Sequence, residues 1–136
     1  MSMVNYAKLI TIAVATTLAL PVLAKDIWPT CAEKVQQIET QLGYAKANGN
    51  EEKMARLQQE KVEVINHCSN KILRQQYVEK VNKYSVKVDE TQQKLIKAQN
   101  KGDAKKVNQV QLKLAERKRD LQEAKDKLAR FDRVSK

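Results

Sequence analysis

Apolar residues recur at intervals of three and four along most of the chain, the spacing that places them on one face of an α-helix. The first run, in residues 31–47, has apolar positions at Val35, Ile38, Leu42 and Ala45. Thr30 stands before this run and Glu33 follows three positions later, which matches a capping box that satisfies the first free amides of a helix. We therefore expect the first helix to begin at Cys31.

The sequence Asn48-Gly49-Asn50 interrupts this pattern. Gly49 tolerates a positive φ, and Asn50 can cap a helix that starts at Glu51. The apolar positions of this second helix are Met54, Leu57, Val64 and Ile65, with Cys68 on or near the same stripe. A turn at Gly49-Asn50 predicts that the two helices fold into an antiparallel hairpin over residues 31–68.

The second half of the chain repeats this plan with two heptad runs. The first run is Tyr77, Val81, Tyr84, Val88, Thr91, Leu95 and Ala98, and the second is Val107, Val110, Leu114, Arg117, Leu121, Ala124, Leu128 and Phe131. Between them, Gly102 can end one helix and Asp103 can cap the next. We expect a second hairpin over residues 71–132.

The connection between the hairpins, residues 66–70, contains neither Gly nor Pro. The chain either turns at Ser69-Asn70 into a compact four-helix bundle, or continues as one long central helix. Reflection about the Gly102 turn brings Phe131 to within one residue of Ile72, close to where the first hairpin ends, and this match of lengths favours the second arrangement. The sequence thus predicts an all-α fold of two tandem antiparallel helical hairpins, coiled-coil-like and elongated, with a long central helix.

Residues 1–24 are expected to be a secretory signal peptide. Lys8 precedes an uncharged, mostly apolar stretch of 16 residues, 9–24, which ends with Val22 and Ala24 at the small-residue positions of a cleavage site. That stretch is shorter than the roughly 20 residues of a spanning helix. We expect cleavage after Ala24, a periplasmic location, and a single helical domain over residues 25–136 with no transmembrane segment.

Cys31 and Cys68 are the only cysteines, and thiols outside the cytosol tend to be oxidised. Cys31 lies 18 residues before Gly49 and Cys68 lies 18 after Asn50, so an antiparallel hairpin brings them together at its open end. A redox-active Cys31 is the alternative, but common redox centres place their cysteines two residues apart. We expect a structural disulfide. His67 is the only histidine, which disfavours a metal site, and no cofactor is indicated.

The net charge of +10 is unevenly distributed. Residues 25–68 carry 6 basic and 7 acidic side chains, and residues 69–136 carry 19 basic and 9 acidic ones. This asymmetry indicates either a solvated coiled-coil surface or a contact surface for an anionic partner. The candidate contact residues are Lys105, Lys106, Arg117, Lys118 and Arg119. Trp28 either anchors a partner or packs over the disulfide.

Several of these features together resemble a known family. They are Cys31, the turn at residues 44–50, Cys68, the Lys101-Gly102-Asp103 turn and the signal segment. The combination is similar to the YqjC-like family of small exported bacterial proteins, a domain of unknown function. The resemblance implies a periplasmic helical protein and transfers no catalytic residue.

No paired carboxylates, nucleophile with a base, phosphate loop or metal cluster can be assembled from the sequence, so we expect no enzymatic activity. The function that we expect is that of a periplasmic binding or adaptor protein, with an anionic envelope component or an acidic protein as its partner. Nucleic acid is disfavoured by the expected compartment. The alternative is a stress-type periplasmic chaperone, although the Leu-Thr-x-x-Gln signature of the small helical chaperones is absent.

Overall fold

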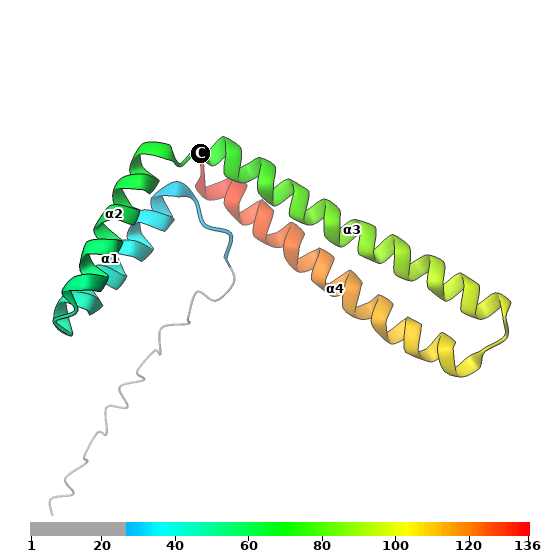
Figure 1. The fold of residues 1–136 in the computed structure, drawn as a ribbon. Helices are drawn as coiled ribbons and strands as arrows, with labels where there is room; N and C mark the ends of the chain where they lie inside the picture. The colour runs from blue at the N-terminus through cyan, green and yellow to red at the C-terminus, as the bar shows by residue number, and fades with distance from the viewer. Residues whose placement is uncertain (1–26) are drawn as a thin grey trace, which may run out of the picture.

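The structure, a computed structural model, describes residues 27–136 as four helices joined by short loops (Figure 1). The helices are α1 (Cys31–Ala47), α2 (Glu51–His67), α3 (Asn70–Asn100) and α4 (Ala104–Val134). Among the described helices, extensive packing joins α1 to α2 and α3 to α4. The prediction of an all-α fold built from helical hairpins is confirmed. The predicted signal peptide, residues 1–24, lies outside the described residues.

Capping side chains begin three of the helices at the predicted positions. The Thr30 hydroxyl accepts a hydrogen bond from the Glu33 amide at 3.2 Å, and the Thr30 amide donates to the Glu33 carboxylate at 2.9 Å. The capping box before α1 is therefore complete. Asn50 and Asp103 each accept a hydrogen bond from the amide three residues ahead, at 3.0 and 2.9 Å.

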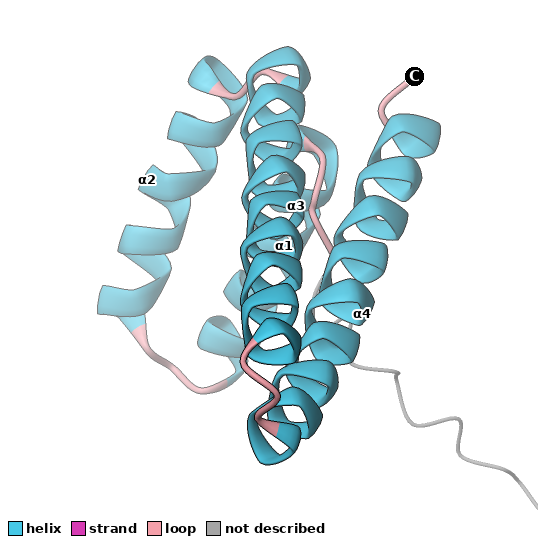
Figure 2. Ribbon diagram, turned by 90° about the vertical axis from the view of Figure 1, so that its right-hand side faces the viewer, coloured by secondary structure: helices cyan, strands magenta, loops and turns pink. Residues whose placement is uncertain are grey.

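Two glycines make the three-residue turns at the hairpin tips. Gly49 has a φ of 63° and Gly102 has a φ of 68°, in the left-handed region that side chains with a Cβ rarely adopt. Figure 2 shows how short these connections are beside the helices that they join. The tight turns keep the two helices of each hairpin side by side.

The prediction of a continuous central helix was wrong. α2 ends at His67 and α3 begins at Asn70, with Cys68 and Ser69 in extended conformations (ψ of 135° and 123°). The core positions Val64 and Leu73 lie nine residues apart, so an unbroken helix at about 100° per residue would point them in opposite directions. The break redirects the chain and allows Leu73 to pack near Cys68.

The two hairpins diverge from their open ends, which meet at the middle of the molecule (Figure 1). The helices of the second hairpin have 31 residues each, or about 46 Å, and those of the first have 17, or about 26 Å. The molecule is therefore elongated, and the compact four-helix bundle is not formed.

Each hairpin has its own group of buried residues. In the first hairpin they are Ile38, Ala45 and Leu57, and around the open end of the second they are Leu73, Tyr77 and Phe131. Phe131 is the most deeply buried large side chain, with 1% of its surface exposed. Because the buried residues form two groups, each hairpin packs mainly around its own core, and the two hairpins remain separate arms of the molecule.

Ile65, which we placed on the apolar stripe, and Ile72, which we placed across from Phe131, both lie on the surface. Ile65 is 61% exposed and Ile72 is 53% exposed. Phe131 packs with Leu73 and Tyr77. Exact reflection about Gly102 pairs Phe131 with Leu73, so our expectation of Ile72 was one residue off. One residue turns a helix by about 100°, which is enough to move Ile72 out of the interface.

Candidate binding surface and the junction that supports it

A disulfide between Cys31 and Cys68 closes the open end of the first hairpin, as predicted. Their Cα atoms are 5.7 Å apart, and the two residues are separated by 37 positions in sequence. Residues 27–136 contain no free cysteine. The bridge joins the start of α1 to the residue that follows α2, next to the point where the chain enters α3.

Aromatic side chains pack beside this disulfide. The Trp28 ring stacks on Tyr77 with centroids 4.9 Å apart, and Tyr77 meets Phe131 edge to face at 5.1 Å. Trp28, Cys31 and Cys68 all pack against the same buried group. Trp28 thus joins the segment before α1 to the second hairpin, which agrees with the interpretation that it packs over the disulfide.

Polar contacts hold the same junction. The Asn70 side-chain oxygen accepts a hydrogen bond from the Cys31 amide at 2.9 Å, and Arg130 of α4 forms an ion pair with Glu33 of α1. The hydrogen bond from Arg130 holds the pKa of Glu33 below its ordinary value, the Thr30 amide adds to this effect, and partial burial opposes it. Glu33 therefore caps α1 and also ties α1 to α4.

His67 lies at the end of α2 with 73% of its side chain exposed, 3.6 Å from Glu63. No group of three His, Cys, Asp or Glu side chains within residues 27–136 is arranged to hold a metal ion. The geometry around His67 is that of an exposed residue at a helix end.

The five basic residues singled out from the sequence do not form one patch. Lys105 and Lys106 lie in the first turn of α4, and Arg117 follows 11 residues after Lys106, about 17 Å along the helix. Arg117 is partly buried and lies 3.9 Å from Asp120. The three consecutive residues from Arg117 to Arg119 point about 100° apart around the helix axis. The structure therefore leaves two separate groups.

A shallow hollow near the tip of the second hairpin brings together lysines from both helices. Its floor is Ala98 of α3 and Val110 of α4, and its lysines are Lys94, Lys97, Lys101 and Lys106. Of the five residues predicted from sequence, only Lys106 belongs to this hollow. Our reading of the sequence missed the α3 lysines because they are spaced along the helix instead of clustered.

A second hollow lies toward the junction. It is lined by two aromatic side chains and three lysines, namely Trp28, Tyr84, Lys80, Lys83 and Lys87. The Lys80 ammonium lies 5.6 Å from the centre of the Trp28 ring, and that of Lys87 lies 5.4 Å from the centre of the Tyr84 ring. These distances place both ammonium groups over aromatic faces.

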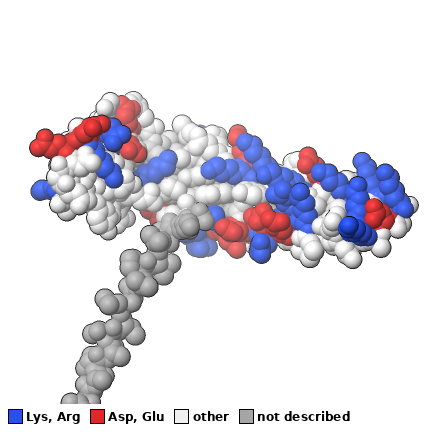
Figure 3. Space-filling view, turned by 60° about the horizontal axis from the view of Figure 1, so that its bottom comes forward, with Lys and Arg blue, Asp and Glu red and all other residues white. Residues whose placement is uncertain are grey.

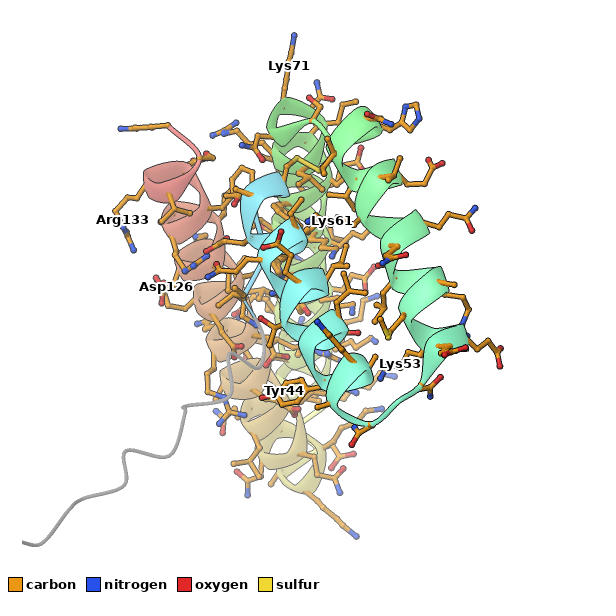
Figure 4. The ribbon with its side chains drawn as sticks, turned by 90° about the vertical axis from the view of Figure 1, so that its left-hand side faces the viewer. Tyr44, Lys53, Lys61, Lys71, Asp126 and Arg133 are labelled. Carbon is orange, nitrogen blue, oxygen red and sulfur yellow. A yellow bond between two sulfur atoms is a disulfide. The ribbon has the colours of Figure 1, made fainter. Side chains whose placement is uncertain are left out.

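The distribution of charge over the surface follows the sequence asymmetry. Figure 3 shows Lys and Arg side chains in a long series along the second hairpin, with acidic side chains gathered beneath part of it. In Figure 4, Lys71 and Arg133 point away from the helices, whereas Lys61 forms an ion pair across the first hairpin with Glu39. Basic groups of the second hairpin are thus presented outward.

No helix within residues 27–136 is both long and apolar enough to span a membrane. The Cys31–Cys68 disulfide is compatible with an exported protein.

Residues 13–123 match the family model of DUF1090, which is described as a protein of unknown function, and the chain belongs to this family. It is also similar to Protein YqjC of Escherichia coli (strain K12), with 36% identity over 74 residues. That match covers 54% of this chain and 61% of the relative, so it spans less than two thirds of the relative's length. No solved structure matches the chain. The resemblance inferred from the cysteines and turns is therefore confirmed.

Proposed function

We propose that this protein is an exported, non-enzymatic binding protein whose second hairpin contacts an anionic partner in the cell envelope. The observation that carries the proposal is the separation of charge between the two hairpins. Residues 25–68 have a net charge of −1, while residues 69–136 have a net charge of +10. An arm with a large net positive charge attracts molecules of opposite charge.

The ion pairs within the protein support the proposal, because arginines form more of them than lysines do and most lysines of residues 27–136 are left without a carboxylate partner. Arg74, Arg117 and Arg130 each lie within 4.0 Å of a carboxylate of the protein. No lysine of α3 has such a partner among the described residues. The arginines thus contribute to the fold. The α3 lysines have no carboxylate partner in the described part of the chain, and apart from the contacts of Lys80 and Lys87 with aromatic rings their charges face the solvent or a bound molecule.

The proposal is tested by binding measurements on the full, disulfide-bonded protein. The probes are inorganic polyphosphate, polyglutamate, polygalacturonate and vesicles of anionic phospholipid. We expect at least one to bind, and to bind more weakly as salt rises through the physiological range, where charges are screened within about 8 Å. If none of the four probes binds at low salt, the proposal is wrong.

Two variants with the same change in net charge, one in each hairpin, show which hairpin binds the anionic probe. The second-hairpin variant reverses four lysines to Glu, namely Lys83, Lys97, Lys113 and Lys125, and should lose binding. The first-hairpin variant reverses Lys34, Lys46, Lys53 and Arg56 to Glu and should keep most of it. Equal losses would show that only the net charge matters. Suppression of the aggregation of an unrelated unfolded protein by both variants would favour the chaperone instead.

A further inference from the structure

The lysines of α3 form a regular row along one edge of the second hairpin. Three of them, Lys80, Lys87 and Lys94, lie seven residues apart, and Lys101, the C-cap residue that follows α3, continues the same face after another seven. Their spacing is about 10.5 Å along the helix axis. Each of these lysines follows a residue of the core stripe by three positions. We call these four residues the lysine row, which is about 32 Å long.

The opposite helix adds positive charge to the same edge. Lys106 of α4 lines the tip hollow together with Lys94 and Lys101 of the row. Lys113 follows Lys106 by seven residues and so lies on the same face of α4. Hairpins of this kind ordinarily place opposite charges at such flanking positions. Near the tip, Lys106 and Lys113 instead add like charges beside the row, an arrangement that a bound anion would stabilise, whereas Asp120 continues the same face of α4 toward the junction.

The apolar surface at this edge is too small to anchor a partner helix or a membrane. Ala98, on the floor of the tip hollow, is only 2% exposed. Val86 and Ile96 are exposed but lie about 15 Å apart along α3, so they form no continuous stripe. Helices that lie on membranes need a bulky apolar face, and a third helix in a coiled coil needs an apolar seam. Charge is therefore the main attraction that the edge offers.

Lysines, not arginines, line this edge near the tip. The row and the facing residues Lys106 and Lys113 carry ammonium groups, which bind phosphate as mobile point charges. The planar fork of arginine, which binds carboxylate or phosphate in one fixed geometry, is used inside the protein, where Arg74 and Arg130 pair with carboxylates of the protein itself. A flexible chain of closely spaced phosphates fits a row of this length and composition.

We propose that the lysine row binds an extended polymer of phosphate groups, which lies along the edge between α3 and α4. This inference rests on the proposed function and narrows it to one edge and one class of partner. The row places its charges over about 32 Å, so a long chain engages several lysines at once whereas a short one engages only one or two. Affinity should therefore depend on chain length.

The first experiment measures the binding of inorganic polyphosphate as a function of its length, using the full disulfide-bonded protein. We expect chains long enough to span the row to bind roughly 100-fold more tightly than triphosphate, because each added contact releases counterions. If triphosphate binds as tightly as the long chains, the site is a single local pocket and the proposal is overturned.

The second experiment compares two variants that change the net charge equally. The edge variant is Lys80→Glu, Lys87→Glu and Lys94→Glu, and the off-edge variant is Lys105→Glu, Lys118→Glu and Lys125→Glu, all on α4. The edge variant should bind long polyphosphate roughly 100-fold more weakly, and the off-edge variant should change by less than about threefold. If the glutamate substitutions reduce helicity, a variant with Gln at the same three edge positions replaces them. It should also bind long polyphosphate more weakly than the wild type, but with a smaller loss of affinity.

Equal losses of polyphosphate affinity in the edge and off-edge variants would show that the lysine row is not the binding site. If polyglutamate or anionic vesicles bind and polyphosphate does not, the proposal that the partner is a phosphate polymer is wrong, and the proposed function as an anion-binding protein still stands. A failure of all the anionic probes would overturn both.

Discussion

The Tyr77 hydroxyl donates a hydrogen bond of 2.9 Å to the backbone carbonyl of Pro29, 48 residues earlier in the chain. This contact joins the segment before α1 to the first third of α3. The Tyr77 ring also lies between Trp28 and Phe131. Burial raises the pKa of Tyr77, and the nearby Glu33 carboxylate raises it further, so the phenol remains a donor at neutral pH. One side chain therefore contacts three parts of the junction.

Replacement of Tyr77 by Phe tests the contribution of this hydrogen bond. The Tyr77→Phe variant keeps the ring stack and loses the donor, so the free energy of unfolding should fall by about 1 kcal/mol. Urea unfolding followed by the fluorescence of Trp28, the only tryptophan, reports on the junction directly. Tyr44→Phe is the matched control, because Tyr44 is 66% exposed and should be replaceable without effect. Equal stability of Tyr77→Phe and the wild type would contradict the assignment.

Removal of the disulfide should destabilise the first hairpin selectively. The bridge closes a loop of 37 residues, and in the loop-entropy model the Cys31→Ser, Cys68→Ser double variant loses about 4 kcal/mol. Hydrogen exchange should show earlier opening of α1 and α2 than of the distal parts of α3 and α4. Two free thiols in correctly exported protein would show that the bridge does not form in the cell.

Two glycines of the first hairpin should respond in opposite directions to replacement by alanine. Gly43 lies inside α1 with no atom within 4 Å of an added Cβ, so Gly43→Ala should stabilise the protein by about 0.5–1 kcal/mol. Gly49 has a φ of 63°, so Gly49→Ala should destabilise it by about 1 kcal/mol. Thermal unfolding measures both variants. A stabilising Gly49→Ala would show that the turn relaxes to another conformation.

The ion pair between Glu33 and Arg130 should make the junction sensitive to acid. The pKa of Glu33 is lowered in the folded protein, so the ion pair stabilises the fold above the pKa of the unfolded chain, about 4.5. This stabilisation is lost as the pH falls through the lower pKa of the folded state. Glu33→Gln keeps a capping side chain but loses the charge, and should cost about 1 kcal/mol at pH 7. The difference from the wild type should shrink as the pH falls below about 4.5 and disappear only below the lowered pKa of the folded state.

A double-mutant cycle checks that Arg130 is the partner in this effect. Arg130→Gln alone should lower the stability at pH 7 as Glu33→Gln does, and the double variant should lose little more than either single variant. Fully additive losses would mean that the two side chains act independently.

The shape of the molecule can be measured by small-angle scattering. A compact domain of this size has a radius of gyration of about 13 Å. Two diverging hairpins, one with helices of 31 residues, should give a clearly larger value. A value near 13 Å for the monomer would indicate that the hairpins fold back on each other in solution.

The helices, caps and turns could be predicted from the sequence because each depends on residues that are close together. Thr30 with Glu33 and Gly49 with Asn50 mark helix ends through local hydrogen bonds and backbone preferences. The disulfide followed from the symmetry of Cys31 and Cys68 about the first turn. These features need no knowledge of how the hairpins pack.

The break between α2 and α3 could not be predicted in this way, because it depends on contacts between distant residues. Trp28 stacks on Tyr77, and Asn70 accepts a hydrogen bond from the Cys31 amide, 39 positions earlier. These contacts form only when the chain leaves the helical path at Cys68 and Ser69. A turn at Ser69-Asn70 was one of our two alternatives, but without Gly or Pro in residues 66–70 the local sequence did not decide between a turn and a continuous helix.

The lysine row was visible in the sequence in principle. Lys80, Lys87, Lys94 and Lys101 repeat every seven residues, but a search for consecutive basic residues selects Lys105-Lys106 and Arg117-Lys118-Arg119 instead. Whether the lysine row of α3 lies beside lysines of α4 depends on how the two helices are aligned in the hairpin, which the spacing of the lysines alone does not fix. The structure shows this alignment at the tip hollow, where Lys106 of α4 lies together with Lys94 and Lys101.

The three-residue turns at the hairpin tips have a consequence for the order of folding. Closing so short a loop has a small entropic cost, so each hairpin can zip up from its tip through contacts that are local in sequence. The most distant contacts, such as Arg130 with Glu33 across 97 positions, all converge at the opposite end. We therefore expect the arms to form first and the junction to close last, with the Cys31 and Cys68 thiols meeting only after α1 and α2 are paired.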